Sequence, residues 1–442
     1  MRAMKDSGIK WIGEIPEEWE VVPFKSYFKL SKGLNITKEN LVPNGIPVIS
    51  YGQIHSKTNT GTAVNADLIR YVPKDFLETN PNCLLSVGSF IFADTSEDKE
   101  GCGNAVYVND ETNPFLFAGY HTIIANPKQY IKNKYLAYLF LTDCWRTQIR
   151  SVVTGIKVYS INQKCLNAST IICPPLSEQQ RIATYLDTKC GEIDELIGIQ
   201  EKFIEELKSY KQSVITEAVT KGLNPNAKRK DSGVEWIGEI PEEWEVRRIK
   251  NIGTAKNGLT YSPSNVCDAS EGTLVLRSSN IQNGLLDFND NLYVNSECED
   301  LKVEVGDIII CSRNGSAALV GKCAIVEEHI NATFGAFMMR FRSMYWGKYI
   351  YYLLQISITK YKRLFSTTTV NQLTIGIFNT LEIPFTPNIA EQQQIATYLD
   401  NKCSQIDSLI ALKQTKIEEL KSFKKSLIYE YVTGKKTVPE TV

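Results

Sequence analysis

A long internal repeat constrains this chain more than any other feature. Residues 6–21 read DSGIKWIGEIPEEWEV, and residues 231–246 read DSGVEWIGEIPEEWEV. A second pair of copies is EQQRIATYLDTKC at 178–190 and EQQQIATYLDNKC at 391–403. The segments between the copies share no comparable likeness. Two near-identical scaffolds around two divergent modules predict a protein that holds two different binding modules in a fixed relation.

Bulk properties set the class of protein. A length of 442 residues suggests two or three domains. The sequence has no apolar run long enough for a membrane span and no signal peptide, so we expect a cytoplasmic protein. Its 11 cysteines include no CxxC pair and indicate reduced thiols rather than disulfides. The three histidines stand far apart, so no metal site is predicted.

The net charge of −1 argues against a uniformly basic nucleic-acid-binding surface. Residues 22–177 hold 15 basic against 11 acidic side chains, and residues 247–390 hold 14 against 12. Residues 178–222 hold 6 against 9. The variable modules are thus mildly basic and the scaffold is acidic, which permits DNA binding but does not require it.

Each variable module reads as an α+β domain. Short β-type runs alternate with Gly, Asn and Asp turns and are followed by one helix, which is expected around 133–150 in the first module and 349–365 in the second. The order of elements matches although the letters differ. The expected strands lie at 47–49, 89–92, 105–108 and 122–124, and at 274–276, 307–310, 323–326 and 337–341.

A long helix follows each module. After Pro174-Pro175, Ser177 is expected to cap the first helix with Gln180 completing a capping box; Asn388 and Glu391 are expected to do the same in the second. Gly222 and Gly434 mark the ends. About 43 residues at 1.5 Å each give a helix of roughly 64 Å.

Both helices carry an apolar stripe that needs a partner. Each helix could pack only on its own module, but the matching lengths and patterns favour pairing of the two helices with each other. The stripe positions are Leu186, Ile193, Leu207 and Val214 beside Leu196, Phe203 and Tyr210, and Leu399, Ile406, Leu420 and Leu427 beside Leu409 and Phe423.

The first helix leads through a basic linker into the second repeat copy, whereas the second helix is followed only by the end of the chain. If that end approaches the N-terminus, the chain forms a circular arrangement of two equivalent units about a pseudo-two-fold axis, with antiparallel helices and a module at each end. The expected segments are an arm (1–21), a first module (22–176), a central helix (177–222), a linker with the second repeat copy (223–246), a second module (247–388), a distal helix (389–434) and a tail (435–442).

The arm WIGEIPEEWEV, the helix start PPLSEQQRIATYLD and the order module, helix, module, helix resemble the specificity subunit of a type I restriction-modification enzyme. The resemblance covers essentially the full chain. It implies two target-recognition domains of α/β type, each reading one half of a bipartite, asymmetric site in double-stranded DNA. It also implies a paired-helix coiled coil that sets the spacing and docks two methyltransferase subunits, with restriction subunits as further possible partners.

The resemblance implies no catalytic residues, and the sequence agrees. The Pro-Pro at 174–175 lacks the flanking residues of a [DN]PP[YFW] adenine-methyltransferase box. The segment from Gly315 to Cys323 has five residues between its glycines where a phosphate loop has four, and Cys323 replaces the metal-binding Ser or Thr. We therefore expect no cofactor in this chain, with S-adenosylmethionine and ATP bound by partner subunits, as the resemblance implies.

Base-edge readout needs Arg or Lys for guanine and Asn or Gln for adenine on stiff elements. Loops rich in such residues follow equivalent strands of the two modules. The candidates for DNA contact are Gln53, His55, Lys57, Lys157, Tyr159 and Asn162 in the first module, and Arg277, Ser278, Asn280, Gln282, Arg313, Asn314, Thr368 and Asn371 in the second. For any one of them a turn-stabilising role is an equal alternative.

Four repeat tryptophans, Trp11, Trp19, Trp236 and Trp244, are expected to act as packing anchors or as a partner-binding surface. Two other classes of protein are alternatives. A coiled-coil scaffold or adaptor with protein-binding modules is disfavoured by polar loops at equivalent points of both modules, and a stand-alone enzyme by the missing motifs.

Overall fold

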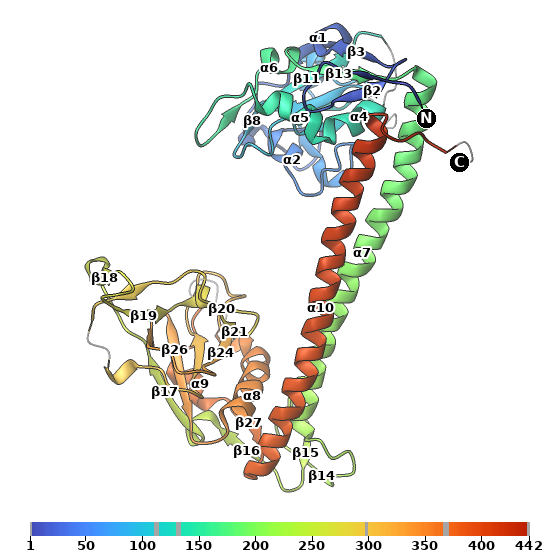
Figure 1. Ribbon diagram of the computed structural model, residues 1–442. Coiled ribbons are helices and arrows are strands. Elements are labelled where there is room, and N and C mark those ends of the chain that lie inside the picture. Colours follow the sequence, from blue (N-terminus) through green and yellow to red (C-terminus); the bar gives the residue numbers. More distant parts are fainter. Residues whose placement is uncertain (1, 110–114, 130–133, 297–298, 366–370, 440–442) are drawn as a thin grey trace. The chain divides into compact units, whose positions relative to one another are not determined.

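The computed structural model describes the chain except residues 1, 110–114, 130–133, 297–298, 366–370 and 440–442. The described residues form two compact units. Unit 1 comprises residues 1–200 and 415–442, and unit 2 comprises residues 201–414. Each unit contains one arm, one variable module, the beginning of one long helix and the end of the other (Figure 1).

The arm of unit 1 is an ordered hairpin followed by a strand that joins the module. Strand β1 (Met4–Asp6) pairs with β2 (Glu14–Pro16), and β3 (Glu20–Pro23) pairs with β13 (Thr170–Cys173). Trp19, between β2 and β3, has no exposed surface. The arm is therefore fixed to its unit by a buried tryptophan.

Unit 2 repeats this arrangement. Strand β14 (Arg229–Asp231) pairs with β15 (Glu239–Pro241), and β16 (Glu245–Arg248) pairs with β27 (Glu382–Phe385). Trp244 is 1% exposed. The two sequence copies thus fold in the same way.

Two sheets form the core of the first module, and the four predicted strands lie in them. One sheet has four strands and the other has three, and short helices and strands connect them. In order across the sheets, the strands are β4 (Phe28–Lys32), β11 (Thr122–Pro127), β7 (Phe90–Ala93) and β9 (Ala105–Tyr107), and β10 (Phe117–Ala118), β5 (Ile46–Ile49) and β6 (Arg70–Val72). The short elements are α1 (Phe24–Tyr27), α2 (Tyr51–Ile54), α3 (Phe76–Thr79), β8 (Thr95–Ser96), β12 (Tyr159–Ser160) and α6 (Gln163–Asn167).

The single helix predicted near 133–150 is wrong, because the structure has two helices there. Helix α4 (Lys134–Leu141) ends before Thr142, whose backbone is extended and whose hydroxyl accepts a hydrogen bond from Trp145 N at 3.4 Å. Helix α5 (Asp143–Arg150) starts there. A threonine cap therefore divides a segment whose apolar pattern reads as continuous.

The second module has two four-stranded sheets, and again the predicted strands lie in them. Helix α8 (Gly347–Lys360) covers the region predicted as helical, and a 3-10 turn follows it. In order across the sheets, the strands are β17 (Gly253–Asn257), β26 (Met338–Ser343), β23 (Ile308–Cys311) and β24 (Cys323–Ile325), and β18 (Val266–Cys267), β22 (Tyr293–Val294), β19 (Thr273–Leu276) and β25 (Ala332–Phe334). The small elements are β20 (Ile281–Gln282), β21 (Leu285–Leu286) and α9 (Ile375–Thr380).

The long helices are α7 (Leu176–Lys221) and α10 (Ile389–Val432), and both end before a glycine in the left-handed region, Gly222 at φ +67° and Gly434 at φ +71°. The expected capping boxes are wrong. Ser177 lies inside the first turn of α7. Asn388 does cap α10, since its side chain accepts from Ala390 N at 3.0 Å, but Glu391 turns to Trp244 instead.

Helices α7 and α10 run antiparallel within each unit, as predicted. In unit 1, Lys424 Nζ lies 2.7 Å from Asp194 Oδ2, and in unit 2, Lys211 Nζ lies 2.7 Å from Asp407 Oδ2. Lys211 follows Asp194 along α7 by as many residues as Asp407 precedes Lys424 along α10. The two ion pairs therefore fit the same antiparallel register. The placement of the units about a common axis stays a prediction.

The apolar stripe divides into two lines. Leu186, Ile193 and Val214 are buried in their units, as are Leu399, Ile406 and Leu427. The adjoining line, expected in the same contact, is exposed, although the Phe203 ring on α7 lies 5.0 Å from Lys413 Nζ on α10. Its members are Leu196, Phe203, Tyr210, Leu409 and Phe423.

Each module is attached to the start of its own long helix by the same side chains. In unit 1, Asp187 on α7 accepts from Tyr138 Oη at 2.6 Å and pairs with Lys134 Nζ at 2.8 Å. In unit 2, Asp400 on α10 accepts from Tyr352 Oη at 2.8 Å and pairs with Lys348 Nζ at 2.9 Å. The likeness of the modules therefore extends to their anchoring contacts.

Candidate nucleic-acid interface

Three separate loops of the second module meet at one place. They follow β19, follow β23, and precede α9. The Asn314 side chain donates from Nδ2 to Ser278 Oγ at 3.3 Å, while Asn371 Nδ2 donates to the Gly315 carbonyl at 3.3 Å. Arg313 and Gln372 form an isolated β-bridge. The sequence-predicted residues Ser278, Arg313, Asn314 and Asn371 thus belong to one cluster, which we call the second recognition cluster.

Arg313 is the exposed cation of this cluster. Its guanidinium lies 5.3 Å from the centre of the Phe337 ring, which is itself 59% exposed. Stacking on an aromatic face holds a guanidinium in place without consuming its hydrogen-bond donors. Arg313 can therefore present a fork of N–H donors to a ligand.

Other predicted residues of this module serve the loop itself. Asn280 has no exposed surface, and its amide bonds the backbone of Arg277, Asp287 and Asp290. Arg277 is tied to Asp290 through an ion pair at 3.0 Å. In this conformation Asn280 cannot reach a base edge, so its predicted role in DNA contact is corrected to a structural one.

The remaining residues of the set differ in exposure. Gln282 is exposed, and its amide donates to the Ser279 carbonyl at 2.9 Å. Thr368 lies outside the described residues. Lys322 Nζ donates to the Ile281 carbonyl at 2.9 Å, and burial lowers its pKa.

The matching loops of the first module also meet. Tyr159 and Ser160 in β12 pair with Ser96 and Thr95 in β8. The His55 ring lies between two partners, with Nε2 2.8 Å from the Thr95 carbonyl and Nδ1 3.1 Å from Asn104 Nδ2. We call this group, around 51–57, 94–96 and 154–162, the first recognition cluster.

Within this cluster the lysines are the groups most available to a ligand. Lys57 and Lys157 are exposed, and Ile156 beside Lys157 is 95% exposed. Gln53 instead accepts from Ser50 N at 3.1 Å in a capping box, and Asn162 caps α6 by accepting from Cys165 N at 3.1 Å. Lys57 and Lys157 are thus exposed cations that a ligand can reach, as Arg313 is in the second recognition cluster.

Sequence reasoning missed the segment Asp94–Ser96 and its partner His121. Asp94 N donates to the His121 carbonyl at 3.0 Å, just as Ser312 N donates to the Phe337 carbonyl at 2.9 Å. Asp94 follows β7 at the point where Ser312 follows β23. The signal was therefore present in the order of strands, since the loop after the equivalent strand was already chosen in the second module.

The repeat tryptophans divide into two classes. Trp19 donates from Nε1 to Glu178 at 2.9 Å, and Trp244 donates to Glu391 at 3.0 Å. Because both are buried, a partner-binding role for these two is wrong and packing anchor is the correct alternative. Trp11 is 43% exposed and Trp236 is half-buried against Tyr361, so both retain surface for a partner.

Comparison with known families decides what this architecture is. The family model of the type I restriction modification DNA specificity domain matches residues 16–209 and again residues 241–422. The chain belongs to this family. It is a specificity subunit of a type I restriction-modification system, and its two variable modules are tandem target-recognition domains.

Curated relatives agree over most of the chain. A putative type I restriction enzyme MjaX specificity subunit of Methanocaldococcus jannaschii is 28% identical, covering 96% of this chain and 95% of its own length. The type I restriction enzyme EcoKI specificity subunit of Escherichia coli K12 is 25% identical, covering 75% of this chain and 69% of its own. The family's repeated organisation is thus retained from end to end of the matched region.

Solved structures share the fold. A chain from work on complex assembly and conformational transition of the type I R-M system superposes with a TM-score of 0.68 at 16% identity, covering 95% of this chain and 99% of that one. The HsdS subunit from Thermoanaerobacter tengcongensis gives a TM-score of 0.50 at 15% identity, covering 95% and 98%. In the part of the chain that the structure describes, no helix is both long and apolar enough to cross a bilayer.

Proposed function

We propose that each recognition cluster reads one half of a bipartite, asymmetric DNA site. The observation that carries this proposal is that loops from equivalent strands converge in both modules and present different exposed cations, Arg313 in one and Lys57 with Lys157 in the other. Different side chains on a shared framework suit two unlike half-sites. A guanidinium fits the O6 and N7 acceptors of guanine.

The paired helices set the distance between the half-sites and hold the methyltransferase subunits. The exposed apolar line supports docking, because large apolar side chains on a helix surface mark protein interfaces. In unit 1 this line includes Leu196 and Phe423, and in unit 2 it includes Phe203, Tyr210 and Leu409, with Ile199 and Leu412 as further exposed apolar side chains of the helices.

The chain itself carries no catalysis in this proposal. Methyl transfer, S-adenosylmethionine and ATP belong to the partner subunits. Turnover of S-adenosylmethionine by the purified chain alone would overturn this part of the proposal.

A salt titration tests the DNA-binding role. The chain, alone and with its methyltransferase subunit, is titrated against a random duplex at rising salt, and the logarithm of the binding constant should fall linearly with that of the salt concentration. No binding at low salt in either form would contradict the proposal.

A further inference from the structure

One difference between the two units lies beside the strand pair that joins each arm to its module. In unit 2, Arg247 on β16 fills the space beside β27. Its guanidinium lies 4.6 Å from the centre of the Phe385 ring, donates to Tyr345 Oη at 2.8 Å and pairs with Glu245 Oε1 at 2.6 Å. A carboxylate, a hydrogen-bond acceptor and two aromatic rings thus enclose one guanidinium.

Unit 1 keeps the carboxylate but lacks the guanidinium. Glu20 stands opposite Cys173 in the β3–β13 pair, as Glu245 stands opposite Phe385 in the β16–β27 pair. Two residues further along β3, the position of Arg247 is taken by Val22.

The aromatic neighbours change as well. Gln129 is the second residue after the end of β11, and Tyr345 is the second residue after the end of β26. Gln129 is therefore the counterpart of Tyr345. Cys173 stands where Phe385 stands in unit 2. Three large side chains of unit 2 are therefore replaced by smaller ones in unit 1.

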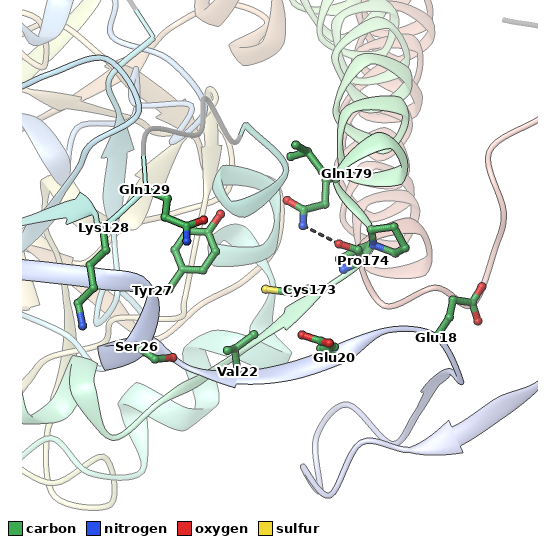
Figure 2. Close-up of a pocket in the computed structure, with 12 residues that line it drawn as sticks. Glu18, Glu20, Val22, Ser26, Tyr27, Lys128, Gln129, Cys173, Pro174 and Gln179 are labelled. Atoms are coloured by element: carbon green, nitrogen blue, oxygen red, sulfur yellow. Dashed lines mark hydrogen bonds between the residues drawn. The ribbon is translucent and has the colours of Figure 1, made fainter.

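These substitutions leave a hollow of about 670 Å³ in unit 1. Ligand pockets fall at about 300–1,000 Å³, so this space is large enough for a bound group. Figure 2 shows Glu20, Val22 and Cys173 along one wall, with Tyr27 and Gln129 across from them.

The charge of the hollow favours a cation. Among the described residues, the Glu20 carboxylate forms no hydrogen bond or ion pair, whereas the neighbouring Glu18 is held by Arg2. Burial, with the nearby Glu20 carboxylate adding to it, raises the pKa of the Cys173 thiol to about 12. The thiol is therefore neutral at physiological pH, and the carboxylate is the charge that a ligand meets.

The lining of the hollow also includes a lysine, Lys128. Its ammonium donates from Nζ to the Lys25 carbonyl at 2.8 Å. Figure 2 shows Lys128 across the hollow from Glu20. Among the described residues, Lys128 forms no ion pair with Glu20.

We propose that this hollow binds an arginine side chain of a bound protein. The carboxylate of Glu20, the amide oxygen of Gln129 and the ring of Tyr27 offer the same three kinds of contact that enclose Arg247 in unit 2. DNA is excluded as the occupant because its phosphates would meet a carboxylate. A planar guanidinium group stacks on a ring and forms paired hydrogen bonds better than the compact ammonium group of lysine does.

The protein that supplies this arginine is the methyltransferase subunit, an assignment that rests on the proposed function. The hollow lies where the arm and the first module meet the start of α7, beside the duplicated scaffold. Unit 2 already contains its own guanidinium at this place. The two units would therefore hold their partner with different contacts.

The chemistry of the hollow is tested without any partner. Binding of N-acetyl-arginine amide to the full chain is measured by saturation-transfer NMR, with N-acetyl-lysine amide as the competing cation. Arginine should bind at least fivefold more tightly than lysine. Val22→Arg should abolish binding because it supplies the guanidinium internally, and Val22→Ile should keep it within twofold.

Two further variants keep the proposal testable if Val22→Arg does not fold. Glu20→Gln, which keeps the shape, should weaken the arginine probe at least fivefold, and Arg247→Val should create a second site in unit 2. No binding by the wild type, or binding that survives Val22→Arg in a folded protein, overturns the proposal. This binding experiment needs neither DNA nor methyltransferase, so a negative result leaves the proposed function standing.

A second experiment uses the complex of this chain with the methyltransferase subunit. Val22→Arg should weaken binding of the methyltransferase subunit at least fivefold, while Val22→Ile leaves it unchanged. Equal affinity for wild type and Val22→Arg would overturn the assignment of this occupant, whereas absence of any methyltransferase binding by the wild type would instead count against the proposed function.

Discussion

The indole N–H of Trp19 donates to Glu178 Oε2 at 2.9 Å, joining the arm to the first turns of α7. The same bond joins Trp244 to Glu391 at 3.0 Å in unit 2. In unit 1, Arg2 adds charged hydrogen bonds to Glu178, and the arm is also held to the residues after α10 by Lys435, which bonds the Glu14 carbonyl. The repeated arm is therefore a structural joint between module and helix.

Trp19→Phe should destabilise the protein by about 1.5–3 kcal/mol, because it leaves the Glu178 carboxylate without one donor in a partly buried site. Urea unfolding followed by circular dichroism measures the loss. Trp11→Phe is the matched control, since Trp11 is 43% exposed, and it should change stability little. Equal losses for both variants would count against the joint.

Gly434→Ala should cost more stability than Gly222→Ala. Both glycines have positive φ, where alanine is strained by about 1–2 kcal/mol. At Gly434 a Cβ would also overlap the Pro16 ring, whereas at Gly222 the nearest atom, Glu391 Oε1, is 3.2 Å away and can move. Thermal unfolding of the two variants compares them directly, and a smaller loss at Gly434 would contradict the contact.

Much of the fold was predictable from the pattern of apolar residues. Strand runs such as residues 308–310 are continuous apolar segments that report buried strands directly. The break at Thr142 was not predictable, because the flanking apolar pattern continues through it and only the local cap divides the helices. Likewise Glu391 reads as a capping residue, but tertiary contact with Trp244 competes for its carboxylate.

The candidate site was predictable at the level of loops and not of side chains. Arg313 and Asn280 both read as base-contacting residues, yet one is exposed over Phe337 and the other is buried with its amide bonded to backbone. Composition alone cannot separate these roles, because Asn and Arg stabilise turns with the same groups that they offer to bases.

Arg313→Ala should weaken binding to the cognate site by about 1–3 kcal/mol and relax specificity only in the half read by the second module. Lys256→Ala on β17 serves as a charge-matched control outside the cluster. Binding is measured against a panel of duplexes with single base changes. Equal weakening on every sequence would show a phosphate contact instead.

Asn280→Ala should lower stability by about 1–3 kcal/mol, because buried backbone carbonyls lose their donor. It should leave base preference unchanged in those molecules that remain folded. Chemical unfolding and the same duplex panel give both readouts. A change of base preference at full stability would restore a direct DNA contact for Asn280.

A matched deletion tests the helices as a spacer. Removing residues 203–209 from α7 and 409–415 from α10 takes one heptad from each helix and keeps the heptad phase and the antiparallel register. Each helix shortens by about 10.5 Å, so the accepted spacer should shorten by about three base pairs. An unchanged spacer in the altered complex would refute the role.

Mapping methylated adenines across the genome of a host that carries this chain with its methyltransferase subunit shows whether the two modules read separate half-sites. We expect a two-part asymmetric motif with a fixed spacer, one half of which becomes degenerate with Arg313→Ala while the other half is retained. A single continuous motif, or degeneracy of both halves together, would contradict it.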